Sequence, residues 1–171
     1  SNWKANQYPI SGPYSNEGVH LVCLENELWV SAGRTTGSNW NNTYNWRGCF
    51  HFNQFDWEAV NRTSISELAD SVDLVSDFIW TTIDPSNTEH VFLSSFRGGL
   101  VEVLSGEMIK RHTYYNSSLQ TRINQGGENV FVSGTCFDNE GNLWVCNSFV
   151  SEPLSMLTPE GEWMSFTCGS S

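Results

Sequence analysis

The sequence predicts an all-β protein, and two observations lead to that expectation. A block of the form Asn-Leu-Trp-Val at 142–145 has weaker echoes at 27–31 and 90–94. Each block is followed by further short apolar runs, and turn-forming residues such as Pro159-Glu160-Gly161 separate these runs. Short strands at regular spacing with turn signals between them are typical of all-β sandwiches and barrels, and a repeat of this kind is typical of propellers.

Each repeat divides into four predicted strands. Four strands in roughly 50 residues is the size of a β-propeller blade. We therefore expect one domain over 1–171, made of three propeller-like blades at about 14–63, 76–115 and 128–168. Propellers close with at least about four blades, so the predicted propeller is incomplete, a fragment of a larger ring. The predicted strands are 19–24, 27–32, 49–53 and 57–60, then 78–84, 90–95, 100–104 and 108–112, and finally 130–132 leading into 134–138, 142–146, 155–158 and 162–166.

Two longer insertions interrupt the regular spacing. The first, 33–47, is rich in Asn and Trp. The second, 61–76, contains Ser64-x-x-Glu67, which is a helix-capping pattern, and it is expected to hold one short helix.

Large apolar residues recur at matching repeat positions. Trp29 and Trp144 share one position, while Trp57, Ile109 and Trp163 share another. Because a position repeated in every blade is typical of packing between blades, we expect the four tryptophans to lie in the inter-blade core.

Charge and composition exclude several classes of function. The net charge is −11 and the longest basic run is the pair Lys110-Arg111. Nucleic-acid binding, which needs clustered Lys and Arg, is therefore not expected, and neither is binding to anionic lipid surfaces. The sequence also lacks an apolar stretch of the ~20 residues that a membrane-spanning helix requires.

The cysteines are five in number and form no C-x-x-C pair, so neither a zinc finger nor a thioredoxin-type site is expected. Burial as small apolar residues in strands is the favoured interpretation. A disulfide between Cys136 and Cys146 on neighbouring strands is the alternative that the sequence leaves open.

Catalytic and metal-binding patterns are also missing from the sequence. It contains no G-x-S-x-G, H-E-x-x-H or P-loop motif, so we expect no enzyme activity and no cofactor. The four histidines are scattered, and nothing in their spacing requires them to converge on a metal. Residues 138–142 (Asp-Asn-Glu-Gly-Asn) resemble half of a calcium loop but lack its bidentate Glu, so a hairpin turn is expected there.

The segment 138–145 (D-N-E-G-N-L-W-V) is similar to the core of the propeller repeats of two-component regulators. The segments 84–92 and 115–119, with Gly98-Gly99-Leu100 between them, resemble the propeller of PorZ-like accessory proteins of type IX secretion in Bacteroidetes. The resemblance spans about 14–168, and the first repeat departs from it because it lacks the turn glycine.

This resemblance implies a non-catalytic, extracytoplasmic propeller in the periplasm or at the surface of a Gram-negative bacterium, acting as a scaffold or interaction module. The alternative is the periplasmic, glycan-sensing propeller of a hybrid two-component sensor kinase. An enzyme such as a propeller lyase or glycosidase is the least favoured hypothesis. The expected partners are other proteins or the remaining blades, with a glycan or self-association as further possibilities.

The best candidates for a ligand-binding surface lie in the first insertion. Trp40, Trp46 and Arg47 fall in a predicted loop, where aromatic rings can stack on sugars and a rigid scaffold can carry a binding site. The competing interpretation is structural, with Trp46 folding back over the apolar edge of its blade.

Overall fold

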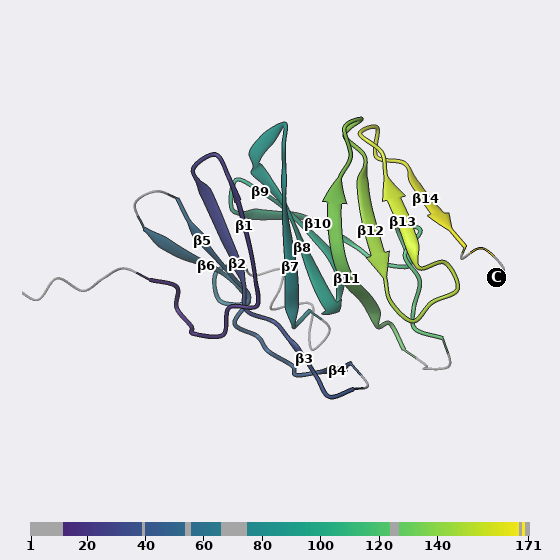
Figure 1. Cartoon of the computed structure of the whole chain (residues 1–171), viewed down its shortest axis with the longest axis horizontal. Helices are drawn as coiled ribbons and strands as arrows, with labels where there is room; N and C mark the ends of the chain where they lie inside the picture. The colour runs from purple at the N-terminus through teal and green to yellow at the C-terminus, as the bar shows by residue number, and fades with distance from the viewer. Residues whose placement is uncertain are drawn as a thin grey trace, which may run out of the picture.

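The computed structural model describes residues 12–38, 40–53, 56–65, 75–123, 127–167 and 169, and among these it contains strands and loops but no helix. Three groups of four antiparallel strands stand side by side (Figure 1), which confirms the predicted fold class of an incomplete propeller. The helix expected near Ser64-x-x-Glu67 falls largely on residues 66–74, outside the described part of the chain. No helix in the described ranges has the length and apolar character needed to cross a membrane.

The strands follow the chain order within each group. The first blade is β1 (His20–Leu24), β2 (Glu27–Ser31), β5 (Cys49–Phe52) and β6 (Trp57–Val60). The second is β7 (Phe78–Asp84), β8 (Asn87–Arg97), β9 (Gly99–Leu104) and β10 (Glu107–His112). The third is β11 (Val130–Phe137), β12 (Leu143–Asn147), β13 (Leu154–Leu157) and β14 (Trp163–Phe166).

The first strands of the three blades are neighbours, because β7 contacts both β1 and β11 (Figure 1). The far end of β8 also pairs with the start of β11, through Arg97 opposite Val130 and Phe96 opposite Phe131. This pairing joins the second and third blades into one eight-stranded sheet, whereas the first blade remains a separate four-stranded sheet.

Two apolar clusters lie between the blades. Side chains alternate between the two faces of a strand, so β8 sends Val91 and Leu93 toward the first blade and Phe92 toward the third. The cluster between the first and second blades is Trp29, Cys49, Val60, Ile65, Val75, Phe78, Ile83, Val91, Leu93, Val101 and Val103. The cluster between the second and third is Phe92, Leu100, Leu119, Val130, Val132, Leu143 and Val145.

The tryptophan prediction is correct for two of the four residues. Trp29 is buried between the first two blades, and Trp163 packs on the cluster between the last two. Trp57 and Trp144 are only half-buried, since they lie on the outer faces of the first and third blades. We call these two outer sheet faces the end faces.

Ile109 does not occupy the repeat position expected for it. A bulge in β10 falls between Met108 and Lys110, and Ile109 at this bulge is 51% exposed. Met108, opposite Val103, instead packs on the apolar cluster between the first and second blades, as Trp163 packs on the cluster between the second and third. The bulge adds one residue and so reverses the faces of the residues that follow.

The expectation of buried cysteines is wrong for three of the four that the structure describes. Cys49 is buried, whereas Cys23, Cys136 and Cys146 are exposed, and all four are unpaired; Cys168 lies outside the described residues. The exposed cysteines lie on the end faces, where the described chain provides no further blade to cover them.

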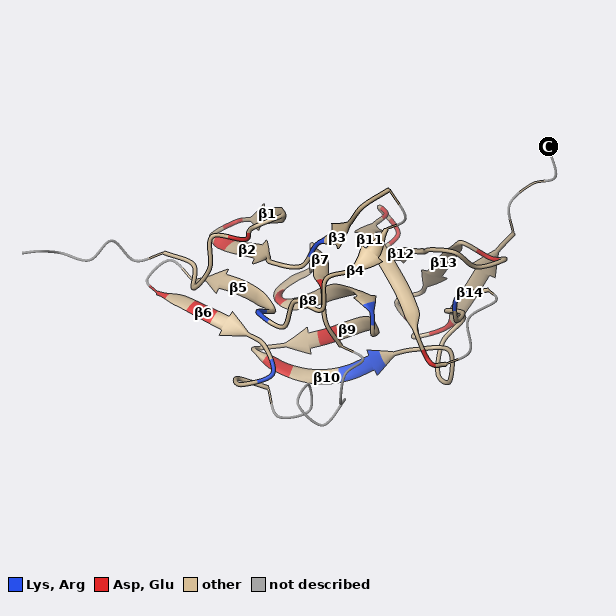
Figure 2. Ribbon diagram, turned by 90° about the horizontal axis from the view of Figure 1, so that it is seen from below, with Lys and Arg blue, Asp and Glu red and all other residues tan. Residues whose placement is uncertain are grey.

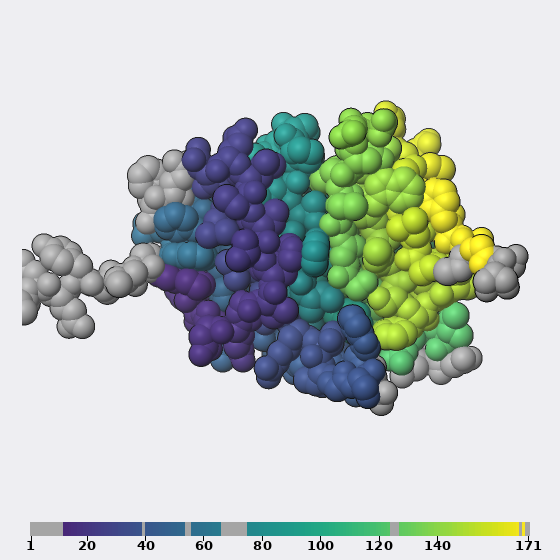
Figure 3. Space-filling model, in the orientation of Figure 1, coloured from purple at the N-terminus to yellow at the C-terminus, as the bar shows by residue number. Residues whose placement is uncertain are grey.

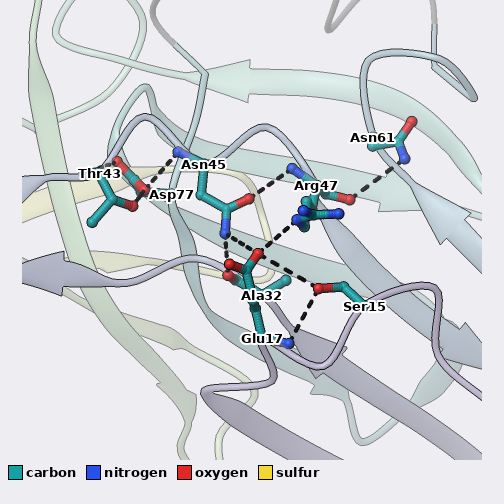
Figure 4. A network of polar contacts seen from close by, with 8 residues as sticks. All are labelled: Ser15, Glu17, Ala32, Thr43, Asn45, Arg47, Asn61 and Asp77. Carbon is teal, nitrogen blue, oxygen red and sulfur yellow. Dashed lines mark hydrogen bonds and ion pairs between the residues drawn. The ribbon is translucent and has the colours of Figure 1, made fainter.

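The first insertion forms an arm, residues 34–47, that carries the short strands β3 (Thr35–Thr36) and β4 (Asn41–Asn42). In Figure 3 the arm runs beneath the second blade toward the third. The buried carboxylate of Asp77 holds it there, accepting hydrogen bonds from the backbone N–H groups of Thr43, Tyr44 and Asn45 at 2.9–3.0 Å. Figure 4 shows Asp77 beside Thr43 and Asn45. Gly33, at the base of the arm, permits this approach because a Cβ there would lie 2.3 Å from the Asp77 carbonyl carbon.

Candidate functional site: a charged cleft between the second and third blades

A cleft of about 850 Å³ opens between the second and third blades. Its rim is made of the β7–β8, β11–β12 and β13–β14 turns, which all lie at the top of Figure 1. Its walls are largely apolar and its floor is charged. The lining residues are Asp84, Pro85, Ser86, His90, Phe92, Glu102, Ile109, Lys110, His112, Phe137, Asp138, Asn139, Glu140, Gly141, Leu143, Leu157, Thr158, Pro159 and Gly161.

The floor of the cleft is a continuous chain of four titratable side chains, all from the second blade. Asp84 Oδ2 lies 3.0 Å from His90 Nδ1, and His90 Nε2 lies 2.8 Å from Glu102 Oε1. The other carboxylate oxygen of Glu102 lies 2.7 Å from Nε2 of His112. His112 is 1% exposed, and its Nδ1 has no hydrogen-bond partner.

Strand register explains why these residues meet. His90 and Phe92 lie two residues apart on β8 and share its face toward the third blade, and Phe92 is opposite Glu102 on β9. The β10 bulge then places Lys110 opposite Glu102 and His112 opposite Leu100. Without the extra residue, His112 would point to the other face of the sheet.

The hydrogen bonds shift the pKa values of three of the four groups on the floor. Burial disfavours the ionised form of Glu102, but the hydrogen bonds from His112 and His90 outweigh it and lower the pKa of Glu102 to about 2. The pKa of His90 is raised, chiefly by its hydrogen bond to Glu102, against the opposing effect of burial and with further help from Asp84. The pKa of Asp84 is lowered: burial acts against this shift, and hydrogen bonds from Ser86 and His90 overcome it.

The opposite wall belongs to the third blade and carries the predicted β11–β12 turn. The Asp138 carboxylate accepts hydrogen bonds from the backbone N–H groups of Glu140 and Asn142 at 3.0 and 2.9 Å, and from Trp144 Nε1 at 2.7 Å. These bonds build the hairpin turn that the sequence predicted. Among the described residues no cluster of three or more His, Cys, Asp or Glu side chains has a geometry suited to a metal ion.

The three residues proposed from the sequence lie elsewhere, on the arm, and the structure does not bring them into one hollow. Trp46 and Arg47 line a hollow of about 460 Å³; Arg62 stacks on the Trp46 ring at 4.1 Å, and Arg47 Nε lies 2.6 Å from Glu17 Oε2 (Figure 4). Trp40, 53% exposed, lines a second hollow of about 260 Å³. A ligand-binding role for these residues stays a prediction.

Sequence reasoning missed the four-residue chain on the cleft floor. It treated the histidines as scattered, yet His90 and His112 converge on Glu102. The available signal was alternation, which puts His90 and Glu102 on one face of adjacent strands once their register is known. The position of His112 depends on the bulge at Ile109, and no residue type in the sequence predicts that bulge.

Comparison with known proteins gives a structural match but no sequence match. No protein-family profile matches the chain, and no curated protein sequence matches it. The fold is similar to part of PorZ, described as an essential bacterial surface component of the type IX secretion system of Porphyromonas gingivalis. The match has a TM-score of 0.75 at 22% sequence identity and covers 96% of this chain but 21% of PorZ. At this identity the likeness concerns the fold, and this chain spans about a fifth of the length of its structural neighbour.

Proposed function

We propose that this chain is a non-catalytic β-propeller scaffold and interaction module of a type IX secretion accessory protein, located outside the cytoplasm. The observation that carries the proposal is the fold match to PorZ over 96% of the chain. The segment at 84–92 supports it independently, because it resembles the propeller of PorZ-like accessory proteins.

The end faces support a role within a larger assembly. Apolar side chains are exposed on both of them, including Leu21 at 65% on the first blade and Met164 at 45% on the third. Propeller blades cover such faces with neighbouring blades. We propose that the end faces meet further blades, with a second copy of the chain as the alternative occupant. Light scattering of the isolated chain tests the alternative, because a monomer at high concentration would contradict self-association.

The Glu102 carboxylate on the cleft floor supports the non-catalytic part of the proposal. Glu102 and Asp84 are both hydrogen-bonded to histidines, and the Ser86 hydroxyl donates to Asp84 at 2.7 Å. A general acid or base needs a proton that it can exchange with a substrate near the working pH. A carboxylate with a pKa of about 2 is a poor candidate for that task.

A glycan-sensing propeller remains the second candidate because of the arm. The exposed indole of Trp40 lies beside a hollow that is also lined by Arg97, Arg122 and Asn129. An exposed aromatic ring beside amide and guanidinium groups suits the stacking and hydrogen bonding of sugars. Loss of glycan-array binding in Trp40→Ala, but not in Trp57→Ala, would favour this candidate.

The main proposal is tested in the native host. An in-frame deletion of the codons for these blades is expected to trap type IX cargo inside the cell, while a tagged wild-type copy restores secretion. The tag should also be cleaved when intact cells are treated with protease, if the module lies at the surface. Normal cargo secretion in the deletion strain would overturn the proposal.

A further inference from the structure

The charges that line the cleft do not cancel. Both ring nitrogens of His90 face carboxylate oxygens, at 3.0 and 2.8 Å, so each must carry a proton and the ring is cationic. Asp84 and Glu102 are then anionic. His112 donates to Glu102 through Nε2, and its buried Nδ1 has no hydrogen-bond partner. Four carboxylates line the cleft, those of Asp84, Glu102, Asp138 and Glu140. They outnumber the three groups of the lining that can carry a positive charge, His90, His112 and Lys110, so the lining keeps a net negative charge.

The surroundings of this charge do not neutralise it. Lys110 is opposite Glu102 in the strand register, and Figure 2 shows the basic segment of β10 beside the acidic position of β9. Its side chain is exposed, and none of the ion pairs found among the described residues joins it to Glu102. On the facing turn, Glu140 adds negative charge and the Asp138 carboxylate is occupied by its own turn.

The walls above the charge are apolar. Phe92 and Pro85 line one side, and Phe137, Leu157 and Pro159 line the other. A hollow of about 850 Å³ is much larger than one ammonium or guanidinium group needs. It has room for a long aliphatic stem and for neighbouring apolar side chains, which is how Lys and Arg bury their stems while their charged ends find a partner.

We propose that this cleft binds a short segment of a partner protein that carries a Lys or Arg side chain flanked by apolar residues. The cationic group meets the lone pairs of Glu102 that the two histidines leave free, and His90 and His112 hold the carboxylate in place. The stem and the flanking residues pack on Phe137 and Leu157. Binding of such a segment depends on the cleft alone and not on a role of the chain in secretion.

The test uses two capped tripeptides that differ only in charge, acetyl-Leu-Lys-Leu-amide and acetyl-Leu-Gln-Leu-amide. Binding is followed through the NMR resonances of the His90 and His112 rings. The Lys peptide is expected to bind at least about tenfold more tightly than the Gln peptide, as a charge meeting a pre-placed partner should. Equal binding of the two peptides, or no binding of either at millimolar concentration, would overturn the proposal.

Three variants assign the effect to the cleft. Glu102→Gln should abolish the preference for the Lys peptide, whereas Glu27→Gln, which alters the His51 partner in the first blade, should leave it intact. Should Glu102→Gln fail to fold, Lys110→Ala changes only an exposed residue, and it should strengthen binding by removing a competing cation. Unchanged preference in Glu102→Gln, or weaker binding in Lys110→Ala, would contradict the assignment.

Two further experiments distinguish a partner segment in the cleft from a free cation and from a second copy of the chain. Methylammonium chloride presents the cation without apolar flanks and should shift the ring resonances only at much higher concentration than the Lys peptide. Dilution of the protein alone should leave those resonances in place. A response to methylammonium equal to that of the peptide would identify a site for free cations, and a dilution-dependent shift would identify a second copy as the occupant. Either result would overturn the partner-protein proposal, and neither would bear on the secretion phenotype.

Discussion

The two spaces between the blades are built from the same repeat, yet the first leaves a hollow of about 340 Å³ and the second a cleft of about 850 Å³. We call the first the closed interface because its hollow is the smaller. Between the first and second blades, Val91, Leu93 and Val101 pack against Trp29 and Cys49. The arm also braces the first blade against the second through the buried Asp77. Between the second and third blades, the apolar cluster reaches only part of the way, and the cleft occupies the rest. One interface is therefore built for stability, while the other keeps a charged surface within reach of solvent.

The difference can be traced to one pair of positions. In the first blade, Glu27 pairs with His51, and the His51 ring stacks on Trp29 at 4.4 Å between ring centroids. In the second blade the two residue types are exchanged, with His90 on the second strand and Glu102 on the third. A carboxylate has two oxygens, so Glu102 accepts from a second histidine as well and extends the network. The first blade therefore has one histidine facing two carboxylates, with Glu58 Oε2 at 3.9 Å from His51 Nδ1, whereas the second blade has a carboxylate that accepts from two histidines.

The largest expected difference between the interfaces comes from a matched pair of leucines. Leu93 is fully buried in the closed interface, and Leu143, 1% exposed, lines the cleft. Leu93→Ala should lower the free energy of unfolding by about 4 kcal/mol, because it leaves an enclosed void. Leu143→Ala should cost about 2–3 kcal/mol, because its void merges with the cleft. Urea unfolding measures both, and equal losses would mean that the two interfaces are packed alike.

The contribution of the arm is measured at Asp77. Asp77→Asn keeps the size of the side chain but replaces an acceptor oxygen with an NH₂ group facing backbone donors. Unfolding should become easier by about 2–3 kcal/mol, since buried N–H groups lose their charged acceptor. Asp56→Asn, at an exposed position, is the control and should have almost no effect. If thermal melts show the same small change for both, the arm does not brace the closed interface.

The smallest expected effect is a pH dependence that belongs to the cleft. The folded pKa of Glu102, about 2, lies below its ordinary 4.5, so its contribution to stability is present above pH 4.5 and is lost as the pH falls toward 2. The raised pKa of His90 works in the opposite direction: its contribution is complete below the ordinary value of 6.5 and is lost as the pH rises through the folded pKa. The network should therefore stabilise most between pH 4.5 and 6.5.

Glu102→Gln should remove this maximum and cost about 2 kcal/mol within that window. Urea melts from about pH 3 to about pH 9, with Glu107→Gln at an exposed position as the control, measure the effect. A constant difference between variant and wild type across the range would show that the network does not titrate as its geometry implies.

The sequence predicted more of the fold than of the site. Turn residues and alternating apolar runs were enough to place the strands, because both signals are local. The expected hairpin at 138–142 also forms, with Asp138 bonded within its own turn. The arm was recognised as an insertion, but its attachment to Asp77, more than thirty residues further along the chain, had no local signal.

The sequence by itself determined that this protein is an array of four-stranded repeats, because strand periodicity and turn chemistry depend on neighbouring residues. Only the tertiary structure decided which repeated residues are core. Trp29 and Trp144 share a repeat position, but one faces the second blade and the other lies on an end face. Tertiary structure also decided the site, since one bulge at Ile109 turned His112 toward Glu102. Burial and convergence depend on which blade stands opposite and on strand register, and both are relations between segments distant in the chain.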